Sequence, residues 1–185
     1  MMTEFNSILV ANRGEIALRI MRTARAMGMT CVAVYTEADA GSPHVGFADR
    51  AICIGTGPVG DSYLDASKVL AAAQEAGAQA VHPGYGFLSE NAEFARACTA
   101  AGLTFIGPSA ESIALMGNKA AAKRRMIEAG VPCVPGYEGT DQSPAVLAAE
   151  AAGIGYPVMI KAAAGGGGRG MRLVTAPEGF ASALD

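Results

Sequence analysis

Short apolar runs alternate with amphipathic segments through the first half of the chain, and no other sequence feature restricts the fold as strongly. The runs that have the composition of buried strands are residues 7–11, 30–35, 51–54, 80–82 and 104–106. The segments that have the length and periodicity of helices are residues 14–27, 65–76 and 89–101. Because such an alternation builds βαβ units with parallel strands, the sequence predicts a doubly wound α/β domain at its N-terminal end.

The first predicted helix shows this periodicity most clearly, and Gly28 follows it, as glycine commonly follows the end of a helix. Its apolar stripe consists of Ile16, Ile20, Ala24 and Met27. Arg19 and Arg22 lie on a separate polar stripe with Glu15. We expect the apolar stripe to pack against the sheet, and residues 36–46 to form a loop.

The pattern changes in the second part of the chain. The helices predicted there are residues 109–116, 119–129, 143–152 and 177–184. Residues 157–162 and 171–175 predict two strands that flank a glycine-rich loop at hairpin distance. A hairpin and one helix cannot bury a sheet face alone, and the chain stops inside its last helix, so we expect these 185 residues to be a fragment.

The balance of charge argues against general nucleic-acid binding. The chain has 14 basic and 17 acidic residues, a net charge of −3, whereas nucleic-acid binders usually carry a basic excess. No apolar run approaches the ~20 residues of a membrane span. The N-terminus has no basic segment before its first apolar run, so it does not predict a secretory signal. We expect neither nucleic-acid nor membrane partners.

The cysteines indicate a reducing compartment. The chain has four of them, Cys31, Cys53, Cys98 and Cys133, widely spaced and without a CxxC pair. With two histidines in all, a zinc site is not expected. Buried free thiols are the simplest interpretation, and they predict a cytoplasmic protein.

The strongest chemical signal is Lys161 followed by a run that includes Gly165, Gly166, Gly167 and Gly168. Successive glycines let backbone N–H groups approach and surround an anion, and a lysine at the base adds a point charge suited to phosphate. The run matches neither a Walker loop nor a GxGxxG fingerprint, because it leads into a strand. It predicts a lid that closes over a nucleotide; the alternative is a flexible surface linker.

Residues 82–91 (HPGYGFLSEN) form a second candidate site, because they follow a parallel strand and lead into a helix. Ligands of open α/β sheets gather at the carboxyl ends of strands. Ser89 is a candidate cap for the helix. The residues leave open whether this is a structural or a ligand-facing turn, and whether His82 is an interior histidine or a catalyst.

A third candidate is Lys119, which follows Gly117 and Asn118 at the start of a predicted helix. Asn118 can cap that helix. A cation is unfavourable at a helix N-terminus, so Lys119 indicates either a bound anion nearby or an exposed lysine. Lys123, Arg124 and Arg125 are expected to form a solvated helix face.

Five stretches together resemble the biotin carboxylase component of biotin-dependent carboxylases, in the ATP-grasp superfamily. They are residues 8–17 (ILVANRGEIA), 82–91, 105–108 (FIGP), 130–136 (GVPCVPG) and 165–171 (GGGGRGM). The similarity runs in register over essentially the whole chain.

The resemblance implies an enzyme that uses MgATP to activate bicarbonate, as carboxyphosphate, and then carboxylates biotin on a carrier domain. It implies a Rossmann-like preATP-grasp domain with a parallel sheet at residues 1–117, followed at 118–185 by linker helices and the first part of an ATP-grasp domain. The implied partners are the biotin carboxyl carrier domain and a carboxyltransferase component, within a homodimer or a larger hetero-oligomer.

The resemblance also assigns roles to individual residues. It implies ATP binding by Lys119, Lys161, Gly165, Gly166, Gly167 and Gly168. It places His82, Tyr85 and Gly86 at the edge of the biotin and bicarbonate pocket, and Arg19 and Arg22 at a dimer interface. It implies no catalytic residue and no magnesium ligand within this chain, so we expect the 185-residue stretch alone to be inactive.

Two other functions fit parts of the pattern. Another ATP-grasp ligase, of the carbamoyl-phosphate or purine-pathway kind, would share the architecture. A non-catalytic nucleotide-binding or assembly module is the second alternative. A nicotinamide dehydrogenase is disfavoured, because the first strand is followed by only one glycine, Gly14, in place of the fingerprint.

Overall fold

The computed structural model describes residues 5–161 and 170–184. The chain divides into two compact units, Met1–Ile113 and Ala114–Asp185, which we call unit 1 and unit 2. Unit 1 contains the parallel sheet and confirms the predicted α/β class.

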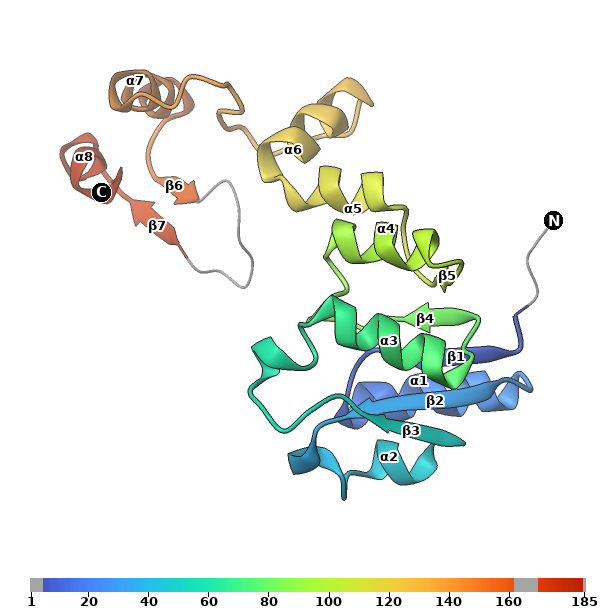
Figure 1. The fold of residues 1–185 in the computed structure, drawn as a ribbon. Helices are drawn as coiled ribbons and strands as arrows, with labels where there is room; N and C mark the ends of the chain where they lie inside the picture. Colours follow the sequence, from blue (N-terminus) through green and yellow to red (C-terminus); the bar gives the residue numbers. More distant parts are fainter. Residues whose placement is uncertain (1–4, 162–169, 185) are drawn as a thin grey trace. The chain divides into compact units, whose positions relative to one another are not determined.

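Unit 1 is built on a five-stranded parallel sheet in the order β3-β2-β1-β4-β5 (Figure 1). The strands are β1 (Ser7–Val10), β2 (Thr30–Tyr35), β3 (Arg50–Cys53), β4 (Ala80–His82) and β5 (Thr104–Phe105). The first strand lies at the centre, where Leu9 pairs with Val32 on one side and Val81 on the other. The loops that follow β1, β2 and β4 therefore leave the sheet side by side at its carboxyl edge.

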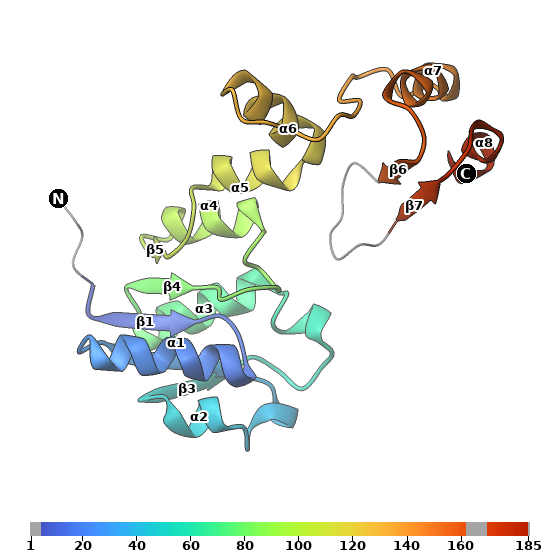
Figure 2. The same ribbon diagram turned by 180° about the vertical axis from the view of Figure 1, so that it is seen from behind.

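Helices cover both faces of this sheet. They are α1 (Gly14–Ala26), α2 (Pro43–Phe47), α3 (Ala66–Ala76) and α4 (Ala92–Ala100), with short 3₁₀ turns η1 (Glu37–Asp39) and η2 (Val59–Asp61). Figures 1 and 2 show α1 on one face and α3 on the other. A further helix, α5 (Ala110–Gly117), crosses from unit 1 into unit 2.

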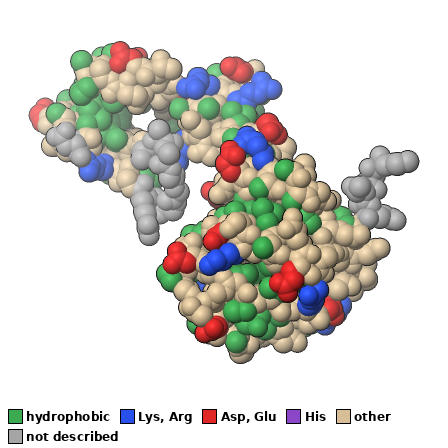
Figure 3. All heavy atoms as spheres, viewed as in Figure 1, with side chains coloured by type: hydrophobic (Ala, Val, Ile, Leu, Met, Phe, Trp, Pro, Cys, Tyr) green, Lys and Arg blue, Asp and Glu red, His purple; other side chains and the backbone are tan. Residues whose placement is uncertain are grey.

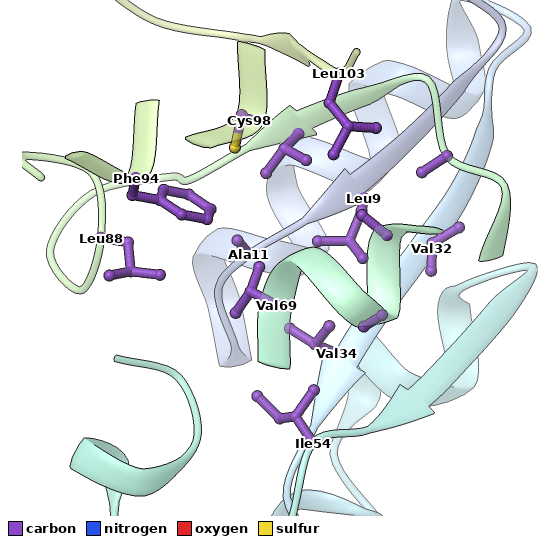
Figure 4. Close-up of a cluster of buried hydrophobic side chains, with 14 of the residues drawn as sticks. Leu9, Ala11, Val32, Val34, Ile54, Val69, Leu88, Phe94, Cys98 and Leu103 are labelled. Atoms are coloured by element: carbon purple, nitrogen blue, oxygen red, sulfur yellow. The ribbon is translucent and has the colours of Figure 1, made fainter. Parts of the chain in front are cut away.

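The two faces of the sheet are buried in separate hydrophobic clusters, which explains why the strand sequences are apolar throughout. Leu9, Val32 and Val81 belong to the cluster under α3 and α4 (Figure 4). Their neighbours Ile8 and Cys31 belong to the cluster under α1. The side chains thus alternate between faces with the period of two expected of strands.

Three local predictions are corrected by the structure. Met27 is 67% exposed, because α1 ends at Ala26 and this residue points past the packed stripe. The predicted loop at residues 36–46 contains η1 and the start of α2. The helix after β4 is capped by Asn91, whose side chain accepts a hydrogen bond from the Phe94 N–H at 2.9 Å, whereas the Ser89 N–H closes a turn onto the Gly86 carbonyl.

Unit 2 combines helices with a two-stranded antiparallel hairpin. Its elements are α6 (Lys119–Glu128), α7 (Pro144–Ile154), β6 (Val158–Lys161), β7 (Met171–Val174), η3 (Pro177–Gly179) and α8 (Phe180–Leu184). The last predicted helix thus begins as a 3₁₀ turn. A small core forms around Ala151, Val174 and Phe180, and Tyr156 packs edge-on against Phe180 with ring centroids 6.4 Å apart.

The surface of the protein carries charges of both signs. Basic and acidic side chains are interspersed on the face shown in Figure 3. Within the described residues, no helix has the length and apolar character needed to cross a bilayer.

All four cysteines are free, but only Cys31 and Cys98 are buried. Cys53 is exposed and Cys133 is half-buried, which corrects the expectation of buried thiols.

Candidate functional site

The loops after β1 and β4 are joined at the carboxyl edge of the sheet by one buried amide. Asn12, only 3% exposed, donates hydrogen bonds from Nδ2 to the carbonyls of Pro83 (2.8 Å) and Tyr85 (2.9 Å). Its Oδ1 accepts the Arg13 N–H at 2.9 Å, which orients the amide so that its donors face the turn. The motif at residues 8–17 therefore holds the motif at residues 82–91.

The turn after β4 has a fixed backbone and an exposed aromatic ring. Gly84 and Gly86 have φ values of +69° and +68°, and Phe87 has φ +43°. The Tyr85 side chain between the glycines is 65% exposed. A tyrosine displayed on a hydrogen-bonded turn suits contact with a ligand at this edge of the sheet.

His82 supports the turn through a hydrogen bond with its backbone. The side chain is half-buried, and its Nδ1 accepts the Gly84 N–H at 3.0 Å. Burial lowers the pKa of this histidine below its ordinary value of 6.5. The imidazole is therefore neutral at pH 7 and binds the backbone of the turn.

A second set of contacts holds the far end of the turn. The Arg13 guanidinium lies 5.4 Å from the Tyr63 ring centroid and 5.8 Å from that of Phe87, and the two rings are stacked 5.3 Å apart. Nη1 of Arg13 donates to Oδ2 of Asp39 at 3.2 Å. We call Arg13, Asp39, Tyr63 and Phe87 the arginine cluster.

The arginine cluster carries a balanced pair of charges. Burial opposes ionisation of Asp39, but hydrogen bonds from Tyr63 (2.7 Å), Arg13 and Thr36 outweigh it and lower the pKa of this carboxyl. Burial and the bond to Asp39 raise the pKa of Tyr63. At neutral pH the cluster therefore contains an ionised carboxylate, a neutral phenol and a guanidinium.

A buried histidine occupies the N-terminus of α1. His44 has no exposed surface; its Nδ1 accepts the Gly14 N–H at 3.3 Å, and with the proton assigned to Nε2 it donates to the Val34 carbonyl at 3.3 Å. In dinucleotide-binding domains the corresponding helix N-terminus binds phosphate. Here the His44 imidazole accepts the hydrogen bond from the first N–H group of α1. This agrees with the absence of a GxGxxG fingerprint after β1.

Acidification is expected to destabilise the chain through His44. Burial lowers its folded-state pKa below 6.5; Asp39 raises it and Arg13 lowers it to smaller extents. The unfolded chain therefore binds a proton first as the pH falls, and stability present above about pH 6.5 is lost below it. His82 acts in the same direction. The urea concentration at the midpoint of unfolding should decrease when the pH is lowered from about 7.5 to about 5.5. The decrease should be smaller in His44→Gln. A midpoint independent of pH in the unsubstituted chain would contradict this prediction.

Two glycines of the turn provide a matched test of the Asn12 contact. A Cβ on Gly84 would lie 2.7 Å from Nδ2 of Asn12, whereas a Cβ on Gly86 would meet no atom within 4 Å. Both have positive φ, so alanine costs each about 1 kcal/mol of backbone strain. Gly84→Ala is expected to lower the free energy of unfolding in urea by about 2–3 kcal/mol, because the clash adds to the backbone strain. Equal losses in the two variants would show that Asn12 does not fit tightly against the turn.

The two predicted nucleotide lysines both belong to unit 2. Lys119 is the first residue of α6, and Asn118 caps this helix as predicted, accepting the Ala121 N–H at 3.0 Å. Lys161 is the last residue of β6, opposite Met171 in the hairpin. Both lysine side chains are exposed. Gly165, Gly166, Gly167 and Gly168 lie outside the described residues.

The basic side chains of α6 do not form the uniformly solvated face that was predicted. Lys123 forms an ion pair with Glu138, and both side chains are largely buried. Together they line an open groove of about 340 Å³ with residues 130–136. Arg125 is exposed and lies 3.6 Å from Glu128. In unit 1, Arg19 and Arg22 are exposed on α1.

The residues that organise the carboxyl edge of the sheet were not predicted from the sequence. Asn12 and Arg13 belong to the motif at residues 8–17, and no role was predicted for Asp39, His44 or Tyr63. A Ser-Pro pair precedes His44 and is a helix-start signal that could have revealed α2. Among the described residues, no group of three or more His, Cys, Asp or Glu side chains could hold a metal ion.

Two family models match consecutive parts of the chain. Residues 4–113 match the model described as biotin carboxylase, N-terminal domain. Residues 118–185 match the model described as carbamoyl-phosphate synthase L chain, ATP binding domain. These matches follow the order of units 1 and 2.

The chain is similar in sequence to carboxylases and carboxylase subunits. The chain is 56% identical over 177 residues to the alpha subunit of mitochondrial methylcrotonoyl-CoA carboxylase from Oryza sativa subsp. japonica, covering 96% of this chain and 24% of the relative. It is 54% identical over 180 residues to biotin carboxylase from Nostoc sp., covering 96% of this chain and 40% of the relative. The chain thus spans 24% of the length of one of these relatives and 40% of the other.

Solved structures agree with the sequence relatives. A biotin carboxylase–beta-gamma-ATP complex from Campylobacter jejuni has a TM-score of 0.94 and 48% identity, covering 97% of this chain and 40% of that one. The biotin carboxylase domain of 2-oxoglutarate carboxylase from Hydrogenobacter thermophilus, solved with MgADP and bicarbonate, has a TM-score of 0.91 and 48% identity, covering 96% and 39%. Since one family model covers more than half of its residues and its relatives align with nearly all of it, the chain belongs to the biotin carboxylase N-terminal domain family and continues into the start of an ATP-binding domain.

Proposed function

We propose that the chain supplies the N-terminal part of a biotin carboxylase that uses MgATP and bicarbonate to carboxylate biotin on a carrier domain. The observation that carries the proposal is the succession of the two family matches along one chain, in the order of its two units. The relatives favour this function over another ATP-grasp ligase, because they are named as biotin carboxylases or methylcrotonoyl-CoA carboxylase subunits.

Within that function, Lys119 and Lys161 would bind phosphate oxygens of ATP. Phosphoryl transfer depends mainly on positioning and on the cancellation of charge at the transferred group, which two ammonium groups provide. Gly165, Gly166, Gly167 and Gly168 would form a lid that donates N–H groups and excludes water, which protects carboxyphosphate from hydrolysis.

His82, Tyr85 and Gly86 would form the edge of the biotin and bicarbonate pocket. The exposed Tyr85 ring and the open space beside Gly86 support this role. Arg19 and Arg22, exposed on α1, would contribute to a subunit interface. The proposed partners are the biotin carboxyl carrier domain and a carboxyltransferase component. A cytoplasmic location stays a prediction, since one relative is named as mitochondrial.

Magnesium would accompany ATP but has no evident site in the part of the chain that the structure describes. No cluster of three or more His, Cys, Asp or Glu side chains occurs there. We therefore assign these residues the binding and positioning of substrates, and no step at the metal.

Carboxylation of free biotin by the intact protein tests the proposal. The protein that contains this chain is incubated with MgATP, ¹⁴C-bicarbonate and biotin, and acid-labile radioactivity on biotin is measured. We expect fixation that requires both ATP and biotin. ATP cleavage without carboxylation of biotin would favour another ligase, and the absence of both reactions would favour a non-catalytic module.

A further inference from the structure

The turn after β4 is held from both sides by two consecutive residues of the turn after β1. Asn12 binds the carbonyls of Pro83 and Tyr85, which lie 71 and 73 residues further along the chain. Arg13 packs over the Phe87 ring with its guanidinium 5.8 Å from the centroid. The contacts thus fall on Tyr85 itself and on residues two positions before and two positions after it.

The contacts fix the backbone without covering the tyrosine ring. Tyr85 belongs to none of the hydrophobic clusters formed by the described residues of unit 1, and its ring is largely exposed. Next to it, the position where a Gly86 side chain would lie is open space. An exposed ring on a preorganised backbone loses little conformational entropy when it binds a ligand.

The surroundings of the ring suit an uncharged ligand. The charge of Arg13 is balanced by Asp39 at 3.2 Å, and burial keeps His82 neutral at pH 7. A phosphate group would therefore gain little net attraction at this turn. The bicyclic ring of biotin, which is neutral and has an apolar face, is a better match for tyrosine and glycine.

We propose that Asn12 and Arg13 are positioning residues that aim Tyr85 at the biotin ring. The inference rests on the proposed function. It assigns the two residues an effect on biotin binding and none on ATP binding.

The first test is Asn12→Asp in the intact protein. This change preserves the shape of the side chain but replaces the NH2 group, which donates both hydrogen bonds, with one carboxylate oxygen that faces the two carbonyls. We expect the KM for biotin to rise about tenfold, on the scale of two lost hydrogen bonds, while the KM for ATP changes less than about twofold. Protonation of the introduced carboxyl restores one donor, so the difference in biotin KM from the unsubstituted enzyme should narrow as the pH falls.

Two further variants keep the test decisive if Asn12→Asp does not fold. Gly84→Ala disturbs the same contact from the turn, and Phe87→Leu removes the ring under the guanidinium; both are expected to raise the KM for biotin selectively. Unchanged biotin KM in the folded variants, or an equal rise in the KM for ATP, would overturn the inference. Failure of the unsubstituted enzyme to carboxylate biotin would instead overturn the proposed function.

Discussion

Replacement of Lys161 by glutamine in the intact protein is expected to raise the KM for ATP at least about tenfold, because a hydrogen bond from a charged group contributes about 1.5–3 kcal/mol. Lys161 ends β6, and its exposed side chain lies outside the small core of unit 2. The substitution therefore removes a charge without removing packing. Steady-state kinetics at saturating bicarbonate and biotin measure the effect.

Arg172→Gln is the matched control for this prediction. Arg172 lies in the same hairpin, and its guanidinium donates to the Ala183 carbonyl at 3.0 Å. Its replacement removes one positive charge from the hairpin as well, so a change in KM that depended only on net charge would occur in both variants. We expect Arg172→Gln to leave the KM for ATP within about twofold. An unaltered KM in Lys161→Gln would remove this lysine from the nucleotide site.

Phe94→Ala is expected to lower the free energy of unfolding by about 3–5 kcal/mol, the usual cost of removing a buried phenylalanine. Phe94 is 1% exposed and belongs to the cluster under α3 and α4 (Figure 4). Its ring packs edge-on against Phe105, with centroids 6.0 Å apart. Phe94 lies in α4, whose N-terminus is fixed by the Asn91 cap, so this helix has little freedom to close the cavity. Urea unfolding of the chain measures the loss.

Tyr85→Ala provides the comparison within the same unit. It also removes an aromatic ring, but from a side chain that is 65% exposed. We expect the free energy of unfolding to change by no more than about 0.5 kcal/mol, as for other surface substitutions. A large loss at Tyr85, comparable with that at Phe94, would mean that the ring supports the fold and is not reserved for a ligand.

The parallel sheet could be predicted because its strands are buried on both faces, so that their sequences are apolar throughout. Local details depended on tertiary contacts. Ser89 and Asn91 are both good capping residues, and only the turn that draws the Ser89 N–H onto Gly86 leaves the cap to Asn91. The short helix α2 begins after Ser42-Pro43 and is stabilised by the burial of His44, which periodicity does not reveal.

The glycines of the candidate site could be predicted from the sequence, whereas the residues that hold the turn in place could not. The glycines on either side of Tyr85 indicate a tight turn from sequence alone, and both have positive φ. The bonds from Asn12 join residues more than 70 positions apart, so no local pattern encodes them. The arginine cluster was hidden for the same reason, since its members come from four separate segments.

A crystal structure of the intact protein with a non-hydrolysable ATP analogue tests the central claim most directly. We expect phosphate oxygens within hydrogen-bond distance, about 2.7–3.2 Å, of Nζ of both Lys119 and Lys161. A triphosphate bound elsewhere, with both ammonium groups in solvent, would contradict it.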